Sequence, residues 1–336
     1  MKPLSRRGVG STPRMSVIGV VLTLFSLSAC GLPASEATPS PVQPSRTLSP
    51  SATTEPSATT EPSPLPSATP TASATPDPTS TPTQTPIPTA TPIPHLVAID
   101  PGHGGIDLGT RHFDADGHMD VYESEVNLAL ALLLRDELLA RGYQVFMTRD
   151  GDYAVNADRQ DLLPDGELTS ADEVQARVDV LNASGAELML SIHQNAFWSN
   201  GEPDQSVGGT CTFYCADRPF ADENRRFAHL LQYHTIEAIR ALGYDPHDRG
   251  ARDDLTIVQP GSPGSHLIVL GPVSERIVRA SEMVGALSET LFLSNDRETE
   301  LLTNPEAQRA MAVGYADAID AYFAGEVSPN MGPDDG

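Results

Sequence analysis

The sequence is poor in basic residues, in cysteines and in long apolar runs. Its 336 residues include 21 Lys and Arg against 45 Asp and Glu, a formal net charge of −24. Nearly all of this charge lies after residue 94, because the charged residues of 31–94 are only Arg46 and four acidic residues. A domain this acidic repels nucleic acids and other polyanions, so we expect no nucleic-acid partner.

Only three cysteines are present, Cys30, Cys211 and Cys215. If Cys211 and Cys215 lie on one extended strand, they are about 13 Å apart, too far to form a disulfide. A hairpin would let them pair in an exported protein. The spacing favours free or hairpin-paired thiols over metal ligands.

The apolar run at the N-terminus, residues 15–28, is short for a membrane-spanning helix, which needs about 20 apolar residues. It follows a basic head and ends in Leu27-Ser-Ala-Cys30, so we expect residues 1–29 to be an export signal. The last four residues resemble the bacterial lipoprotein box, which implies that Cys30 is lipidated and tethers the protein to the outer face of the cell membrane. The alternative is a plain signal peptide with an incidental Cys30.

Residues 30–94 have too few apolar side chains to form a packed core. This stretch is almost wholly Pro, Ser, Thr and Ala, and 17 of the chain's 30 prolines lie in it. Such a composition cannot offset the entropy lost on ordering, and its proline density favours extended polyproline II. We expect a disordered linker that gives an anchored domain reach, followed by a catalytic domain over residues 95–324 and a disordered tail over residues 325–336.

Residues 95–324 alternate strand-like and helix-like patterns. Apolar runs predict strands over 96–99, 143–147 and 188–192, and helical periodicity predicts helices over 125–141, 170–182, 225–242 and 304–323. A capping box of Ser170 and Glu173 is expected to begin the second helix, and a further helix-like stretch lies between Asp152 and Thr169. The alternation predicts an α/β fold, with a mostly parallel central sheet and helices on both faces.

Three side chains have the types and places expected of a catalytic metal site. His103 follows the first strand in the glycine-rich turn Pro101-Gly-His-Gly-Gly105, Glu123 lies just before the first long helix, and His193 ends a buried strand. Two imidazoles and one carboxylate leave a fourth zinc position for water, so we expect one Zn²⁺. Glu289 is the candidate base for that water.

Each of these residues also has a simpler interpretation. Glu123 could be a solvated residue at a helix start, where a carboxylate suits the helix dipole, and Glu125 is a rival ligand. His193 could be a buried core histidine, and Arg177 is expected to be a structural ion-pair partner. The remaining histidines have no motif around them and are expected at the surface or in the core: His112, His118, His229, His234, His247 and His266.

Six motifs follow one another along the chain: Asp100 to Gly105, Glu123 to Leu128, Thr148 to Asp150, Arg177 with Asn182, Ser191 to Ala196, and Glu289 with Phe292 to Asn295. Taken together, they resemble the motifs of the zinc-dependent N-acetylmuramoyl-L-alanine amidases, which cleave the bond between muramic acid and the first L-alanine of peptidoglycan. The resemblance implies zinc held by His103, Glu123 and His193, with Glu289 as the catalytic carboxylate and peptidoglycan as the partner.

Two departures from the family pattern bear on the substrate. Residues 260–271 and 274–284 are expected to form extra loops near the cleft, and Ser288 stands where an aliphatic residue is usual. These departures keep open an amidase acting on soluble muropeptides or other amides. A non-catalytic wall-binding module is a further alternative, although a binder does not need Glu289. Substrate-binding residues and the oligomeric state stay undetermined.

Overall fold

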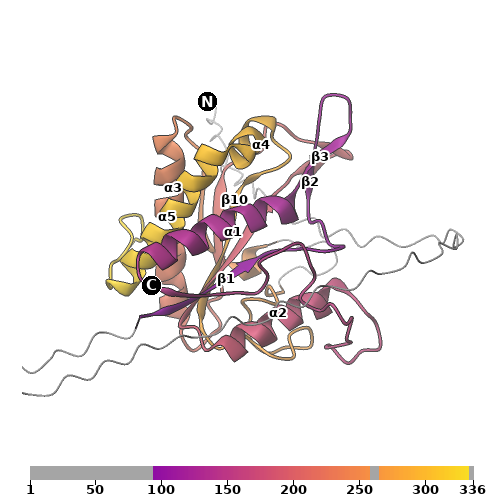
Figure 1. The fold of residues 1–336 in the computed structure, drawn as a ribbon, viewed down its shortest axis with the longest axis vertical. Helices are drawn as coiled ribbons and strands as arrows, with labels where there is room; N and C mark the ends of the chain where they lie inside the picture. Colours follow the sequence, from indigo (N-terminus) through magenta and orange to yellow (C-terminus); the bar gives the residue numbers. More distant parts are fainter. Residues whose placement is uncertain (1–93, 258–264, 333–336) are drawn as a thin grey trace, which may run out of the picture. The chain divides into compact units, whose positions relative to one another are not determined.

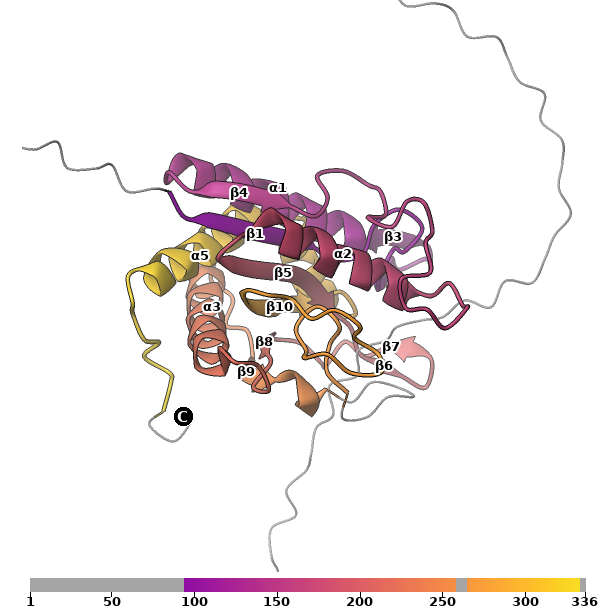
Figure 2. The same cartoon turned by 90° about the horizontal axis from the view of Figure 1, so that it is seen from below.

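The computed structural model describes residues 94–257 and 265–332, which build a central sheet and the helices around it (Figure 1). The predictions for the signal segment, Cys30 and the linker lie outside these residues. The six strands of the sheet follow one another in the order β4-β1-β5-β10-β8-β9 (Figure 2). Their bounds are β1 Leu96–Pro101, β4 Gln144–Met147, β5 Leu188–Asn195, β8 Thr210–Tyr214, β9 Asp248–Asp253 and β10 Val284–Phe292.

Most pairings in this sheet are parallel. β1 pairs in parallel with β4 and β5, β10 pairs in parallel with β5, and β8 pairs in parallel with β9. Only β8 and β10 run antiparallel. The carboxyl ends of β1, β5 and β10 therefore meet at one edge of the sheet, where ligands bind in open α/β folds.

Helices cover both faces, which confirms the predicted fold class. On one face lie α1 (Glu123–Ala140), α3 (Ala221–Ala241) and α5 (Pro305–Phe323), and they share a core cluster with Val97 and Ile99 of β1. On the other face lies α2 (Ser170–Ser184), and its Leu181 belongs to a second cluster with Ala98. Successive residues of β1 point to opposite faces, as the period of a strand requires.

The remaining elements are short. They are the hairpin β2 Arg111–Phe113 and β3 Met119–Tyr122, the hairpin β6 Trp198–Ser199 and β7 Glu202–Pro203, the 3₁₀ turn Asp254–Thr256, and α4 Asp296–Thr303. No helix within the described ranges is both long and apolar enough to cross a membrane.

Three details of the sequence prediction are corrected. Glu123 is the first residue of α1 instead of preceding it. The capping box of α2 is formed by Thr169 and Asp172, one position before the predicted pair. The stretch between Asp152 and Thr169 forms turns and bends with no helix, and buried Asp172 accepts hydrogen bonds from the backbone N–H groups of Leu162 and Leu163 in it.

Candidate active site

The sheet topology places the predicted site residues at one edge of the sheet. His103 lies two residues beyond the end of β1, and His193 lies near the end of β5. Glu289 lies on β10 directly opposite His193 in the strand register. Glu123 enters from the first turn of α1. All four line one cavity.

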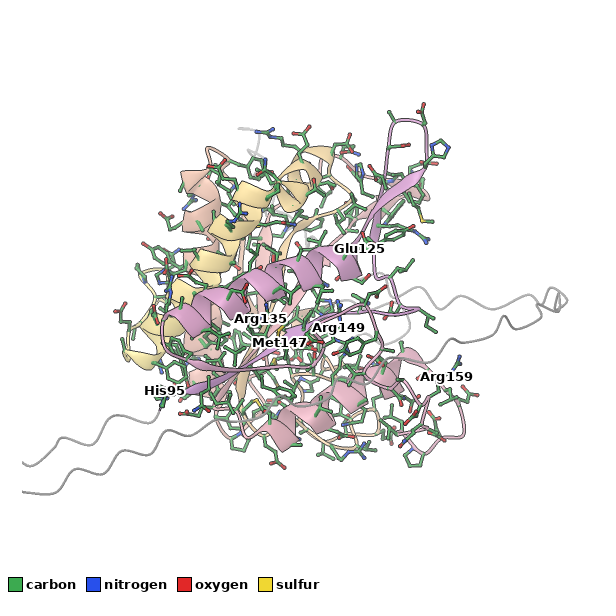
Figure 3. The ribbon with its side chains drawn as sticks, in the orientation of Figure 1. His95, Glu125, Arg135, Met147, Arg149 and Arg159 are labelled. Atoms are coloured by element: carbon green, nitrogen blue, oxygen red, sulfur yellow. The ribbon has the colours of Figure 1, made fainter. Side chains whose placement is uncertain are left out.

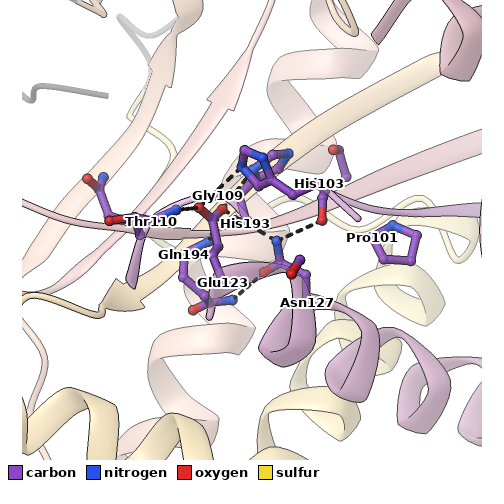
Figure 4. A network of polar contacts seen from close by, with 12 residues as sticks. Pro101, His103, Gly109, Thr110, Glu123, Asn127, His193 and Gln194 are labelled. Carbon is purple, nitrogen blue, oxygen red and sulfur yellow. Dashed lines mark hydrogen bonds and ion pairs between the residues drawn. The ribbon is translucent and has the colours of Figure 1, made fainter. Parts of the chain in front are cut away.

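His103, Glu123 and His193 offer ligand atoms that all lie within 4.8 Å of one another. The two oxygens of Glu123 face different imidazoles: Oε2 is 3.2 Å from Nε2 of His103, and Oε1 is 3.0 Å from Nδ1 of His193 (Figure 4). Backbone N–H groups of Thr110 and Gln194 also donate to these oxygens, at 2.8 and 3.1 Å. The carboxylate is therefore held in place between two histidine nitrogens.

His103 has a second carboxylate partner that sequence reasoning missed. Oδ2 of Asp107 lies 2.9 Å from Nδ1 of His103, which leaves Nε2 facing Glu123. Burial alone would lower the pKa of His103. The neighbouring carboxylates of Glu123 and Asp107 outweigh this effect and raise the pKa of His103 to about 10. Burial would raise the pKa of Glu123, but the neighbouring His103 and His193 hold it well below its usual value. The carboxylates around the two histidines therefore favour a positive charge at this point of the cavity.

Two glycines make room for the cluster. A Cβ at Gly102 would lie 2.2 Å from Cε1 and Nε2 of His193. A Cβ at Gly109 would lie 2.5 Å from Oε2 of Glu123 and 2.7 Å from Cδ2 of His103, and Gly109 has a φ of +68°. Both positions therefore need glycine for the imidazoles and the carboxylate to gather.

Glu289 is buried with a carboxylate oxygen left unpaired. It is 1% exposed, and its Oε2 has no hydrogen-bond partner within the described residues. Burial and the nearby carboxylate of Glu123 raise the pKa of Glu289 well above its usual value, against an opposing effect of His103. A buried, unpaired carboxylate beside candidate metal ligands is typical of a functional group. Two imidazoles and a carboxylate are ligand types that a divalent cation such as zinc prefers. The space that Gly102 and Gly109 leave and the unpaired Oε2 of Glu289 also fit such an ion.

A buried ion pair supports the turn that carries His103. Nη1 of Arg177 lies 2.9 Å from Oδ1 of Asp100, and Arg177 also donates to the backbone oxygens of Pro101 and His103. Burial would raise the pKa of Asp100, but Arg177 leads the interactions that hold it below its usual value. The structural interpretation of Arg177 is confirmed. Arg149, which Figure 3 labels, is fully buried. It donates to the backbone oxygens of Pro101 and Gly102 in this turn and to that of Ser124 on α1.

The rival ligand Glu125 is excluded by its position, because its side chain is exposed on the first turn of α1 (Figure 3). The described part of the predicted extra loops does border the cavity, which is lined by His266, Leu267, Ile268, Val269 and Arg276. His266, which was expected at the surface or in the core, is partly buried and lines this cavity. No local pattern around His266 signals this position.

The comparisons with known proteins agree with this architecture. The family model described as N-acetylmuramoyl-L-alanine amidase matches residues 97–321. A germination-specific N-acetylmuramoyl-L-alanine amidase of Bacillus subtilis (strain 168) is 30% identical over 238 residues, which cover 70% of this chain and 82% of the relative. The amidase AmiA of Salmonella typhimurium is 26% identical over 249 residues, which cover 68% and 76%.

Among solved structures, the CwlD amidase from Clostridioides difficile, determined in complex with the GerS lipoprotein, matches with a TM-score of 0.51 and 23% identity. The match covers 69% of this chain and all of that chain, and it supports the α/β fold alone. The extent of the family match, together with the Bacillus subtilis relative, shows that the chain is an enzyme of the N-acetylmuramoyl-L-alanine amidase family.

Proposed function

We propose that this chain is a zinc-dependent cell-wall hydrolase that cleaves the amide bond between N-acetylmuramic acid and L-alanine in peptidoglycan. The observation that carries the proposal is the convergence of His103, Glu123 and His193 beside the unpaired carboxylate oxygen of Glu289. The curated relatives are named as amidases of this bond, which supports the choice of substrate.

His103, Glu123 and His193 would hold the ion. Zinc supplies a Lewis acid that polarises an amide carbonyl and lowers the pKa of water toward 7. Asp107 keeps Nε2 of His103 directed toward Glu123 by occupying Nδ1, as outer partners of ligating histidines do. Gly102 and Gly109 leave space for this arrangement.

Glu289 would move the protons. Its unpaired Oε2 would accept a proton from water as the water oxygen bonds to the carbonyl carbon of the substrate. It would then pass this proton to the alanine nitrogen as the C–N bond breaks. Because burial raises the pKa of Glu289, the carboxylate is a stronger base than a solvated one. The products are a carboxylate on muramic acid and a peptide with a free N-terminal L-alanine.

The test is product analysis on purified peptidoglycan sacculi and on soluble muropeptides, with zinc content measured in parallel. Glu289→Gln should keep zinc and reduce hydrolysis about 10²–10⁴-fold, the usual size of a lost acid–base contribution. His193→Ala should lose the metal, because two protein ligands bind zinc weakly. Glu125→Gln is the matched control, since this exposed carboxylate lies two residues from Glu123, and it should keep both zinc and activity.

Other outcomes would refute parts of the proposal. Undiminished zinc in His193→Ala would reject the ligand set, and loss of zinc in Glu289→Gln would make Glu289 a ligand. Hydrolysis of muropeptides without hydrolysis of sacculi would identify the alternative substrate. Binding to sacculi with no new amine would identify a wall-binding module.

We also propose that Cys30, which lies outside the described residues, is lipidated and anchors the enzyme to the outer face of the cell membrane. The Leu27-Ser-Ala-Cys30 sequence after a short apolar run supports this. The Pro/Ser/Thr-rich residues 30–94 would then let the catalytic domain reach the wall.

A further inference from the structure

A second cluster of metal-ligand side chains lies apart from the His103 set. Cys215 directly follows β8, Asp254 begins the 3₁₀ turn after β9, and His266 is the second described residue after the gap at 258–264. Their ligand atoms lie within 4.8 Å of one another. Cys215 and Asp254 are fully buried. Three separate segments of the chain thus bring sulfur, oxygen and nitrogen donors to one point.

The distances resemble those around a tetrahedral zinc ion. Zinc–sulfur and zinc–nitrogen bonds of about 2.3 and 2.0–2.1 Å place the two ligand atoms about 3.5 Å apart. Sγ of Cys215 is 3.5 Å from Nδ1 of His266. Oδ1 of Asp254 is 2.8 Å from the same nitrogen, a hydrogen-bond distance that would open by about 0.5 Å around an ion.

The groups around the cluster complete the pattern of a metal site. Nε2 of His266, which faces away from the sulfur, lies 3.3 Å from Oδ2 of Asp217. The second oxygen of Asp254 accepts a hydrogen bond from the backbone N–H of Leu267 at 2.9 Å. Ligating histidines commonly donate their other ring N–H to a carboxylate, and ligating carboxylates are themselves hydrogen-bonded.

Cys211, which lies on β8 itself, lacks these partners. Cys211 is also buried and free, but its sulfur lies 3.5 Å from the backbone oxygen of Gly250. Burial raises the pKa of both thiols to about 12, so acidity does not distinguish them. The partners of the sulfur distinguish Cys215, and Cys211 supplies a matched control.

We propose that Cys215, Asp254 and His266 bind a second metal ion, of the zinc class, that ties the loop bordering the catalytic cavity to the edge of the sheet. A thiolate, an imidazole and a carboxylate suit zinc better than calcium or magnesium. Binding would release the thiol proton of Cys215 to solvent. His266 also lines the cavity, as do its neighbours Leu267 to Val269, so the ion would hold that wall in place.

The test uses the full-length protein loaded with cobalt(II), whose absorption reports a sulfur ligand through a thiolate charge-transfer band in the near ultraviolet. The His103 set contains no sulfur, so the band reports only the second site. We expect two metal equivalents and the band in the wild type. Cys215→Ser should remove the band and one equivalent, whereas Cys211→Ser should keep both.

Two further variants keep the result interpretable. His266→Gln, which retains both cysteines, should also lose one equivalent and weaken the band, so the outcome does not depend on the folding of Cys215→Ser alone. His193→Ala should lose the other equivalent and keep the band, which separates this proposal from the proposed catalytic zinc. One equivalent without the band in the wild type, or loss of the band in Cys211→Ser, would overturn the proposal.

Discussion

Gly102 controls where the imidazole of His193 can lie. A Cβ at this position would sit 2.2 Å from two ring atoms of His193, closer than packed atoms come. The His193 side chain is 17% exposed, so we expect Gly102→Ala to push the ring aside without unfolding the domain. Zinc affinity should fall about 10–100-fold, which is the usual effect of removing a group that orients a metal-ligating side chain.

Competition with a chelator measures this affinity. The control is Gly151→Ala, because a Cβ there meets only the ring edge of exposed Tyr153 at 3.2 Å. Equal zinc affinity in both variants would show that His193 accommodates the extra carbon or does not bind the ion.

Arg276, like Glu289, lines the cavity and has a side-chain polar atom without a hydrogen-bond partner among the described residues. Its Nη1 is buried and has no hydrogen-bond partner within the described ranges. A substrate carboxylate would satisfy this guanidinium by a charge-assisted hydrogen bond. Losing such a bond costs about 1.5–3 kcal/mol, so Arg276→Gln should raise KM for a soluble muropeptide about 10–100-fold with little change in kcat.

Steady-state kinetics separates KM from kcat for this variant. Arg279→Gln is the comparison, because Arg279 lies on the same segment and pairs with Asp179 on α2, outside the cavity. A similar rise in KM in both variants would point to a general loosening of the segment instead of recognition of a carboxylate.

At the scale of elements, α2 depends on a carboxylate at its start. Asp172 is buried and accepts hydrogen bonds from the backbone N–H groups of Thr169, Leu162 and Leu163. Burial would raise the pKa of Asp172, but these hydrogen bonds outweigh it and lower the pKa. Asp172→Asn replaces one accepting oxygen by an amide group and should reduce the free energy of unfolding by about 1 kcal/mol at pH 7.

The sign of the pH dependence follows from the lowered pKa. The carboxylate contributes stability above the unfolded-state pKa of about 3.9, and this contribution is lost as the pH falls through the lower folded-state value. Denaturant unfolding should therefore show a smaller difference between wild type and variant at pH 3 than at pH 7. Exposed Glu167→Gln, close to the same helix start, should change stability little at either pH. A difference that does not depend on pH would contradict the charge-based explanation.

At the scale of the whole molecule, the proposed lipid anchor at Cys30 would govern where the catalytic domain works. We expect Cys30→Ser to release the protein or to leave it unprocessed, because stable anchoring needs more than one acyl chain and this residue would carry them. Membrane fractionation and mass spectrometry of the N-terminal peptide measure the effect. Cys211→Ser, in the catalytic domain, should stay in the membrane fraction. A wild type found wholly in the medium without lipid would reject the anchor.

The sequence alone was enough to predict the family and the α/β class. It also named His103, Glu123, His193 and Glu289, which line one cavity of the structure and whose roles stay predictions. Helical and strand periods are local, so α1, α3, α5 and the strands β1, β4 and β5 could be read within a residue or a few of their bounds. The strands β8, β9 and β10 were not predicted. The motifs around His103, Glu123, His193 and Glu289 are also short, and their order along the chain was sufficient for the family resemblance. Errors occurred where local signals competed, as in the stretch between Asp152 and Thr169, whose backbone is held by Asp172 instead of by helical hydrogen bonds.

Only the tertiary structure decided which of the remaining polar groups meet. Asp107 became a partner of His103 because a tight turn folds it back. Arg276, which lies between the undescribed residues 258–264 and β10, lines the same cavity as His103. Cys215 and His266 meet in the same way, across strands and loops that carry no common pattern. Local sequence specifies the backbone elements, whereas contacts between distant segments depend on strand order and packing, and no short pattern of residues encodes these.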